Sequence, residues 1–396
     1  MTEGQALVEK ARALAPLLSR QAAANEKAGR LSEETVAALR EAGFFGLLVP
    51  KCFGGYEAMP DVALAVIEAI SEADGSSGWV LMACNVGTGS AAGYLPKAGA
   101  EAVFGKHIPI IAGEGAPKGR AEIEGKGFRL SGRWSYGSGV LHTEYLHTGG
   151  TVYENGAPRL LPGTRVPETR TFIVPTKECK FLGNWDVMGL NGTGSIDYGL
   201  EDVYVPAEFT HSPNALVAVQ GGALYRIGIV GMSPLGHTGF TLGLGRRILD
   251  EVYTLVHAPS GRPSPLGEVG GSDSFQQDYG AAEAKLRAAR AFCFETWRDV
   301  AATLKRDEKV TQRQFTLMRL CLNHVTTAVM EIATFAHRAG GGVALRSGPL
   351  QRCFRDMFAA TQHRIVSANT LRLCGRELLG LAKDKVWATA GLVDPY

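Results

Sequence analysis

The sequence predicts an α+β protein of several domains, in which two helical segments flank a central β segment. Apolar residues recur at helical spacing up to about residue 108 and again after about residue 210. Between them, glycines, turn pairs and alternating residues dominate. The 396 residues, 45% of them hydrophobic, are enough for two or three domains with a sizeable core. We therefore expect domains at residues 1–108, 109–210 and 211–396.

The composition argues against several classes of protein. The formal net charge of +2 creates no strong field for nucleic acid or an anionic membrane. No apolar stretch reaches the roughly 18 residues of a membrane span, and the charged N-terminus is unlike a signal peptide. The seven cysteines form no CxxC pair, and no cluster has metal-ligand spacing. We expect a cytoplasmic protein with reduced thiols and no metal.

The N-terminal segment contains clear helix signals and one misleading motif. Ser32 is a typical N-cap, and Pro60 opens a further helix. Residues 87–92 read GTGSAA and match the dinucleotide fingerprint G-x-G-x-x-A. However, no strand–helix–strand alternation surrounds them, and Lys106 stands near the position of the expected acidic residue. We interpret the run as a turn of small residues between two helices.

The central segment contains short strand patterns at 171–174, 185–187 and 203–205 and a hairpin turn at 154–156. The stretch GFRLSGRWSYGSG, residues 127–139, is predicted to be a strand with Tyr136 and Ser138 on one face. A flavin ring requires a flat wall and a hydrogen-bond donor near N5 or C4a, which these residues would supply. An ordinary strand with a surface serine explains the pattern equally well.

Two glycine-rich segments are also candidate ligand contacts. Residues 192–195 read GTGS and offer backbone N–H groups and hydroxyls to anionic oxygens, although a plain hairpin loop is the alternative. The run at 340–342 either lets the backbone approach a ligand closely or ends a helix.

The C-terminal segment is predicted to contain helices at 239–256, 274–304, 311–338 and 349–380, with a loop at 258–274. In the last helix, Arg352 and Asp356 are one turn apart, at a spacing that suits an ion pair. His363 follows two alanines that leave space beside its imidazole. A core histidine that bonds a carbonyl is the alternative.

Three motifs resemble those of flavin-dependent monooxygenases built on the acyl-CoA dehydrogenase fold. They are PLQR-x-x-RD followed by His363, G-x-W-x-(aromatic)-x-S-G at 132–139, and MG-x-x-GTGS at 188–195. The resemblance implies an N-terminal helical domain, a central β-barrel domain and a C-terminal four-helix bundle, assembled as a homotetramer or dimer.

The resemblance also implies functional residues. His363 and Ser138 would be catalytic, with His363 as acid or base because its pKa lies near working pH. The implied flavin contacts are Trp134, Tyr136, Gly137, Ser138, Gly192, Thr193, Gly194, Ser195, Arg262, Gly341 and Gly342.

The chain departs from the family pattern at four positions. Arg364 stands where many acyl-CoA dehydrogenases carry their catalytic glutamate. Asn191 replaces an arginine, and Gly87 replaces a histidine found in several monooxygenase relatives. Only GRPSPLG, around Arg262, stands in place of R-x-x-FG, so either FMN or FAD is expected.

The implied activity is a monooxygenase that uses reduced flavin and O2 to oxidise a small aromatic or amine substrate through a C4a-hydroperoxide. A separate flavin reductase would supply the reduced flavin. Two alternatives remain open: an acyl-CoA dehydrogenase-like flavin dehydrogenase or oxidase, and a non-catalytic ligand-binding relative. Neither the substrate nor the reductase follows from the sequence.

Overall fold

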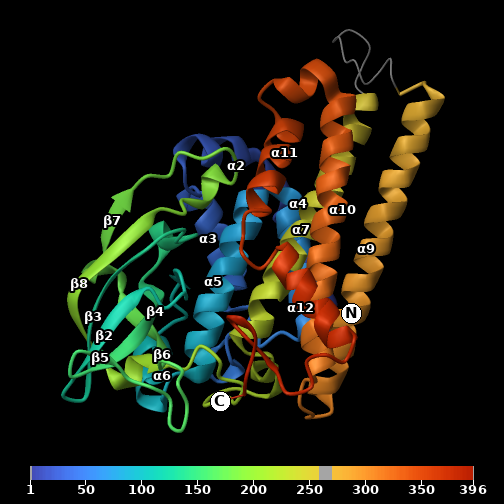
Figure 1. Cartoon of the computed structure of the whole chain (residues 1–396). Coiled ribbons are helices and arrows are strands. Elements are labelled where there is room, and N and C mark those ends of the chain that lie inside the picture. Colours follow the sequence, from blue (N-terminus) through green and yellow to red (C-terminus); the bar gives the residue numbers. More distant parts are fainter. Residues whose placement is uncertain (1, 258–269, 396) are drawn as a thin grey trace.

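The computed structural model describes residues 2–257 and 270–395, and its N-terminal helices lie between a sheet and long C-terminal helices (Figure 1). The N-terminal helices are α1 (Glu3–Ala13), α2 (Ala15–Ala28), α3 (Glu33–Glu41), α4 (Pro60–Ala73), α5 (Gly75–Tyr94) and α6 (Lys97–Phe104). Within the described residues, no helix is both long and apolar enough to cross a membrane. The predicted arrangement of helical, β and helical regions is confirmed.

Nine strands form one mixed sheet next to α5 and α6. They are β1 (Ile111–Ala112), β2 (Gly119–Glu124), β3 (Gly127–Trp134), β4 (Tyr145–Glu154), β5 (Ala157–Pro158), β6 (Thr169–Pro175), β7 (Lys180–Gly183), β8 (Asp197–Pro206) and β9 (Thr210–His211). The order β7-β8-β3-β2-β4-β6-β9 is an open path, in which β4 also pairs with β1 and β5. A short hairpin, β10 (Val386–Ala388) and β11 (Gly391–Val393), lies near the C-terminus.

Two strand predictions were wrong. Residues 185–187 form no strand, because the Trp185 indole instead donates to the Asn191 carbonyl at 2.9 Å and supports the loop before β8. The strand predicted over 127–139 ends at Trp134. Tyr136 then adopts a left-handed φ of 65° and is 69% exposed, whereas Ser138 is buried. The two side chains therefore do not share a strand face.

The C-terminal region contains α7 (Gly228–Val256), α9 (Asp273–Lys305), α10 (Gln312–Leu345), α11 (Pro349–Ala360) and α12 (Ala368–Leu378). The three helices predicted between 239 and 338 are confirmed, while the loop predicted from residue 258 falls mostly outside the described residues. The glycine run at 340–342, for which a helix end was one of two alternatives, lies inside α10, which kinks at Gly341, where φ is 48°.

The helix predicted over 349–380 is interrupted at residues 361–367, and His363 lies in this connection. The Asn323 side chain donates to the Ile365 carbonyl at 3.2 Å and accepts from the Ser367 N–H at 3.1 Å. The Ser367 hydroxyl then caps α12 by accepting from the Thr370 N–H. These side-chain bonds replace the backbone bonds of a continuous helix.

The middle of α11 holds the loop before β8. Asp356 Oδ1 accepts from the Leu190 N–H at 2.6 Å, and Arg355 donates to the Met188 carbonyl at 2.8 Å. The predicted pairing of Arg352 with Asp356 was wrong, because Arg352 faces Glu26 of α2 at 3.9 Å. Asp356 and Arg355 bond the loop instead.

The run GTGSAA lies within α5, so the turn predicted there was wrong. Gly87 is buried where α5 crosses β1, and a Cβ built on it would lie 2.6 Å from the Ile111 carbonyl oxygen. The small side chains of this run permit close packing of a helix on a strand.

Replacing Gly87 with alanine should destabilise the protein by about 1–3 kcal/mol, because the added methyl group meets backbone that cannot move aside. Urea unfolding measures the change. The matched control is Gly280→Ala at an exposed position of α9 with no heavy atom within 4 Å, where alanine should stabilise slightly. Equal stability of wild type and Gly87→Ala would contradict the packing described.

The Asp356 clamp should make stability depend on pH. Burial raises the pKa of Asp356 to about 7, against the lowering effect of the Leu190 N–H, and Asp74 raises it further. The unfolded carboxyl has a pKa near 4, so the folded state binds the proton more tightly. This contribution to stability is therefore complete below about pH 4 and is lost as pH rises through about 7.

Asp356→Asn should remove this dependence while its amide oxygen still accepts from Leu190. Between pH 5 and 8, wild type should lose roughly 2–3 kcal/mol more unfolding free energy than the variant. Urea unfolding of both proteins at the two pH values measures the difference. If the unfolding free energies of both proteins changed equally with pH, Asp356 would not be the source of the dependence.

Candidate active site

A chain of hydrogen bonds joins α5 to the loop before β8. The Trp79 indole N–H donates to Ser138 Oγ at 2.9 Å, and Ser138 Oγ lies 2.5 Å from Ser195 Oγ. Ser195 Oγ lies 2.9 Å from Thr193 Oγ1, which donates to the Leu190 carbonyl at 2.7 Å. Three segments that are distant in sequence therefore meet at Ser138.

Both ends of this chain fix its direction, because an indole N–H only donates and a carbonyl only accepts. The Thr193 hydrogen is directed to Leu190, so Ser195 donates to Thr193 and Ser138 donates to Ser195. Ser138 accepts one bond from Trp79 and keeps one lone pair. In this arrangement Ser138 is an acceptor toward a ligand, not the donor expected from the sequence.

Two histidines pack beside the same tryptophan. The ring centroid of His237, on α7, is 5.1 Å from that of Trp79, and the centroid of His363 is 6.2 Å from it. The two imidazole centroids are 4.2 Å apart. Trp79 therefore links Ser138 and His363, and the structure brings together the two residues that the sequence singled out.

Both imidazoles are held neutral near pH 7. The expectation that the pKa of His363 lies near working pH was wrong: burial, then electrostatic repulsion from His237 and Arg364, hold this pKa well below its usual value. Burial lowers the pKa of His237 to about 4, although its bond to the Ser233 carbonyl opposes the shift. His363 Nδ1 accepts from the Ile365 N–H at 3.4 Å, which leaves the ring proton on Nε2. His363 is partly exposed, so this side of the cluster is accessible.

The remaining predicted contacts divide into residues near Ser138 and residues elsewhere. Gly137 packs against Val140 and Tyr198, where a Cβ would lie 2.7 and 3.0 Å from them. Gly192 is buried beside Ser76, and Gly194 has a left-handed φ of 54° between Thr193 and Ser195. These glycines shape the loop that carries the hydroxyl chain.

Trp134 was wrongly predicted to contact the flavin. Its side chain is fully buried, donates to the Gly149 carbonyl at 2.9 Å and stacks on Tyr198. It therefore belongs to the core of the sheet, with no surface for a cofactor.

Gly341 and Gly342 lie apart from His363. A Cβ on their neighbour Gly340 would lie 2.9 Å from Leu350, at the start of α11, whereas His363 follows its end. Twelve helical residues span about 18 Å. Arg262 lies outside the described residues.

Sequence reasoning did not assign roles to Trp79 and His237. Gly236 and Gly239 flank His237, and a Cβ on them would lie 2.8 Å from Met82 and 2.9 Å from Ile67. This close packing of α7 on α5 and α4 places His237 against Trp79. Glycines beside a histidine were the available signal, but it becomes informative only when the partner helix is known.

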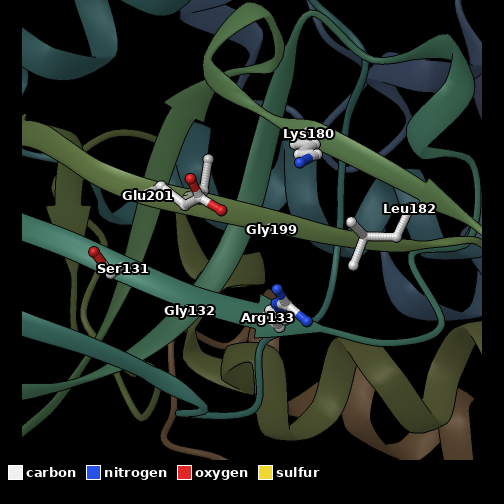
Figure 2. A pocket seen from close by; sticks show the side chains of 8 residues that line it. Ser131, Gly132, Arg133, Lys180, Leu182, Gly199 and Glu201 are labelled. Atoms are coloured by element: carbon white, nitrogen blue, oxygen red, sulfur yellow. The ribbon is translucent and has the colours of Figure 1, made fainter.

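Figure 2 shows a separate pocket of about 250 Å³ along β3, β7 and β8. Its lining includes Arg133, Lys180 and Glu201. It includes neither the hydroxyl chain around Ser138 nor Trp79 and the two histidines beside it. It therefore lies outside the candidate active site.

Comparison with known proteins gives consistent matches. The family model described as the acyl-CoA dehydrogenase N-terminal domain matches residues 2–114, and the C-terminal domain model matches residues 235–368. Indole-3-acetate monooxygenase of Pseudomonas putida is 31% identical over 88% of this chain and 87% of its own.

Two further matches extend over nearly the whole chain. The oxygenase component of FADH2-dependent resorcinol hydroxylase from a Rhizobium species is 26% identical, covering 95% of this chain and 94% of its own. The crystal structure of 3-HSA hydroxylase from Rhodococcus sp. RHA1 has a TM-score of 0.85 at 25% identity. The match covers 95% of this chain and 97% of that chain. This protein therefore belongs to the flavin-dependent monooxygenases of the acyl-CoA dehydrogenase superfamily.

Proposed function

We propose that this chain is the oxygenase component of a two-component system that hydroxylates a small aromatic substrate with reduced flavin and O2. A separate flavin reductase supplies the reduced flavin. The observation that carries the proposal is the meeting of Ser138 with two neutral histidines around Trp79. The indole and resorcinol derivatives named for two relatives support an aromatic substrate.

The residues around Ser138 fit a flavin. Tyr136 offers a 69% exposed aromatic ring two residues before Ser138, whose oxygen keeps a free lone pair. Reduced flavin carries an N–H at N5, and the Ser138 oxygen could accept a hydrogen bond from such a group. Bound reduced flavin would supply the electrons that activate O2. The FADH2-dependent relative favours FAD, although Ser138 and Tyr136 would suit FMN equally.

The chain's own groups have distinct tasks in this proposal. Trp79 orients the Ser138 hydroxyl, and Phe240 packs edge-on against Trp79 with ring centroids 4.9 Å apart, which limits access of water. His363 is partly exposed and neutral with its hydrogen on Nε2, so it would pass that proton to the substrate while Nδ1 takes up another. A neutral imidazole performs this work without a buried charge.

The monooxygenase function is favoured over an acyl-CoA dehydrogenase activity. Arg364, at the position of the dehydrogenase glutamate, donates to the Thr389 carbonyl at 2.9 Å and cannot serve as a base. The groups described around Trp79 are hydroxyls, imidazoles and an aromatic ring, with no carboxylate among them.

A homotetramer or dimer in the cytoplasm is also part of the proposal. Large apolar side chains are exposed on α12 and just after it: Leu371, Leu378, Leu379 and Leu381. Such a patch suits contacts between subunits.

Protein mixed with reduced FMN or FAD should convert resorcinol or indole-3-acetate to hydroxylated product when exposed to O2. His363→Asn should lower the rate about 10²–10⁴-fold, as expected for loss of a general acid or base. Single-turnover product analysis measures both. His324→Asn, at an exposed position of α10, is the control and should leave the rate unchanged. Reduction of bound flavin by an acyl-CoA, without hydroxylated product, would refute the proposal.

The direction of the hydroxyl chain predicts a preference for reduced flavin. Ser195→Ala removes the acceptor of the Ser138 hydrogen, which then becomes free to donate to N5 of oxidised flavin. The ratio of affinities, reduced over oxidised, should fall about five- to tenfold in this variant. Anaerobic fluorescence titration of both flavin forms measures the ratio.

The control is Thr193→Ser, which keeps a hydroxyl at the next position of the chain. It should leave the ratio near that of wild type. An unchanged ratio in Ser195→Ala would show that Ser138 does not bond N5 as an acceptor.

A further inference from the structure

We propose that His237 recognises the substrate, and that its Nε2 accepts a hydrogen bond from a ring N–H or a phenolic O–H. The proposal rests on the proposed function, because it places the aromatic substrate beside the Trp79 cluster. It narrows the substrate class to aromatic rings with a hydrogen-bond donor, such as indoles and phenols.

The hydrogen bond at one side of the His237 ring fixes its tautomer. His237 Nδ1 lies 2.8 Å from the carbonyl oxygen of Ser233, one turn earlier on α7. A carbonyl can only accept, so Nδ1 carries the hydrogen. In the neutral ring, Nε2 is then an acceptor with a free lone pair.

The second observation is that this acceptor has no partner. His237 is 7% exposed, and its Nε2 is buried without a hydrogen bond among the described residues. Buried polar atoms in native proteins are nearly always satisfied, and an unsatisfied one opposes folding. A donor on a bound ligand would satisfy Nε2.

The surroundings of His237 suit a flat ring. The imidazole packs edge-on against Trp79, with an interplanar angle of 83°, and lies at 37° to the ring of His363. Trp79 also bonds Ser138, so a substrate at His237 lies next to the groups assigned to the reaction. The Trp79 side chain would thus contact both the residue that recognises the substrate and the residues assigned to the reaction.

Three other histidines, His142, His147 and His211, also have buried Nε2 atoms without a hydrogen bond. The ring centroids of His147 and His211 are 6.1 Å apart. However, they lie in strands β4 and β9, and neither ring contacts Trp79 in the described part of the chain. His142 lies in the short helix Val140–His142 and likewise makes no ring contact with Trp79. Among the histidines that the structure describes, only His237 combines a buried, unpaired Nε2 with a ring contact to Trp79.

Equilibrium binding of matched probes tests the proposal. Indole and benzofuran have nearly the same shape, but only indole carries an N–H donor, and phenol differs from anisole in its O–H. Isothermal titration calorimetry on flavin-loaded protein gives the four affinities. Wild type should bind indole more tightly than benzofuran, or phenol more tightly than anisole, by about tenfold. The reason is that a ligand without a donor leaves the buried acceptor unpaired, which costs binding free energy.

Three variants separate recognition from packing. His237→Phe keeps an aromatic ring against Trp79 but removes the acceptor, so the preference should fall to about one. His237→Gln has a side-chain oxygen that can accept and should retain part of it. Thr241→Val, which removes a hydroxyl bonded to the His237 carbonyl on the same helix, should retain all of it.

The outcomes distinguish this inference from the proposed function. Wild type that binds none of the probes or shows no preference overturns the inference, as does a preference that survives in a folded His237→Phe. Thermal unfolding establishes that each variant is folded. Because binding needs no turnover, a donor preference without hydroxylated product would refute the proposed function and leave the recognition role of His237 intact.

Discussion

The hydrogen bond from the Trp79 indole to Ser138 is the contact on which the candidate active site depends. It crosses from the N-terminal part of α5 to the segment after β3, and so joins the helical region to the sheet. The same indole supplies the surface against which His237 and His363 pack. A displacement of Trp79 would therefore separate hydroxyl from imidazole at the same time as it released the orientation of Ser138.

The surrounding fold holds this contact in place by fixing the loop before β8. Asp356 binds the Leu190 N–H, and the Leu190 carbonyl in turn receives the last hydrogen of the hydroxyl chain. A residue of α11 thus fixes the far end of a chain that begins on α5. His363 follows the same helix, and Asn323 holds the connection in which it lies. The positions of Ser138 and His363 therefore both depend on α11.

The sequence predicted what local patterns encode. Helical periodicity located α7, α9 and α10, and the motifs around Ser138 and His363 identified two residues that meet in space. It failed where tertiary contacts override local pattern. Gly87 looks like a turn but lies in a helix pressed onto β1, and Trp134 matches a flavin motif but is buried in the sheet. The glycines near His237 were a local signal that could not be interpreted, because the role of His237 depends on a partner on another helix.

Ser138 Oγ and His237 Nε2 are both left free as hydrogen-bond acceptors, and each is so for the same reason. The Leu190 carbonyl ends the chain of hydroxyls, which directs the Ser138 hydrogen away from any ligand. The Ser233 carbonyl accepts a hydrogen bond from Nδ1–H of His237, which leaves Nε2 without a hydrogen. Backbone carbonyls cannot reverse roles, so neither direction can adjust without breaking a bond. These two acceptors would favour ligands that supply hydrogen-bond donors, and in the proposals above a reduced flavin at N5 and an indole or phenol would meet that requirement.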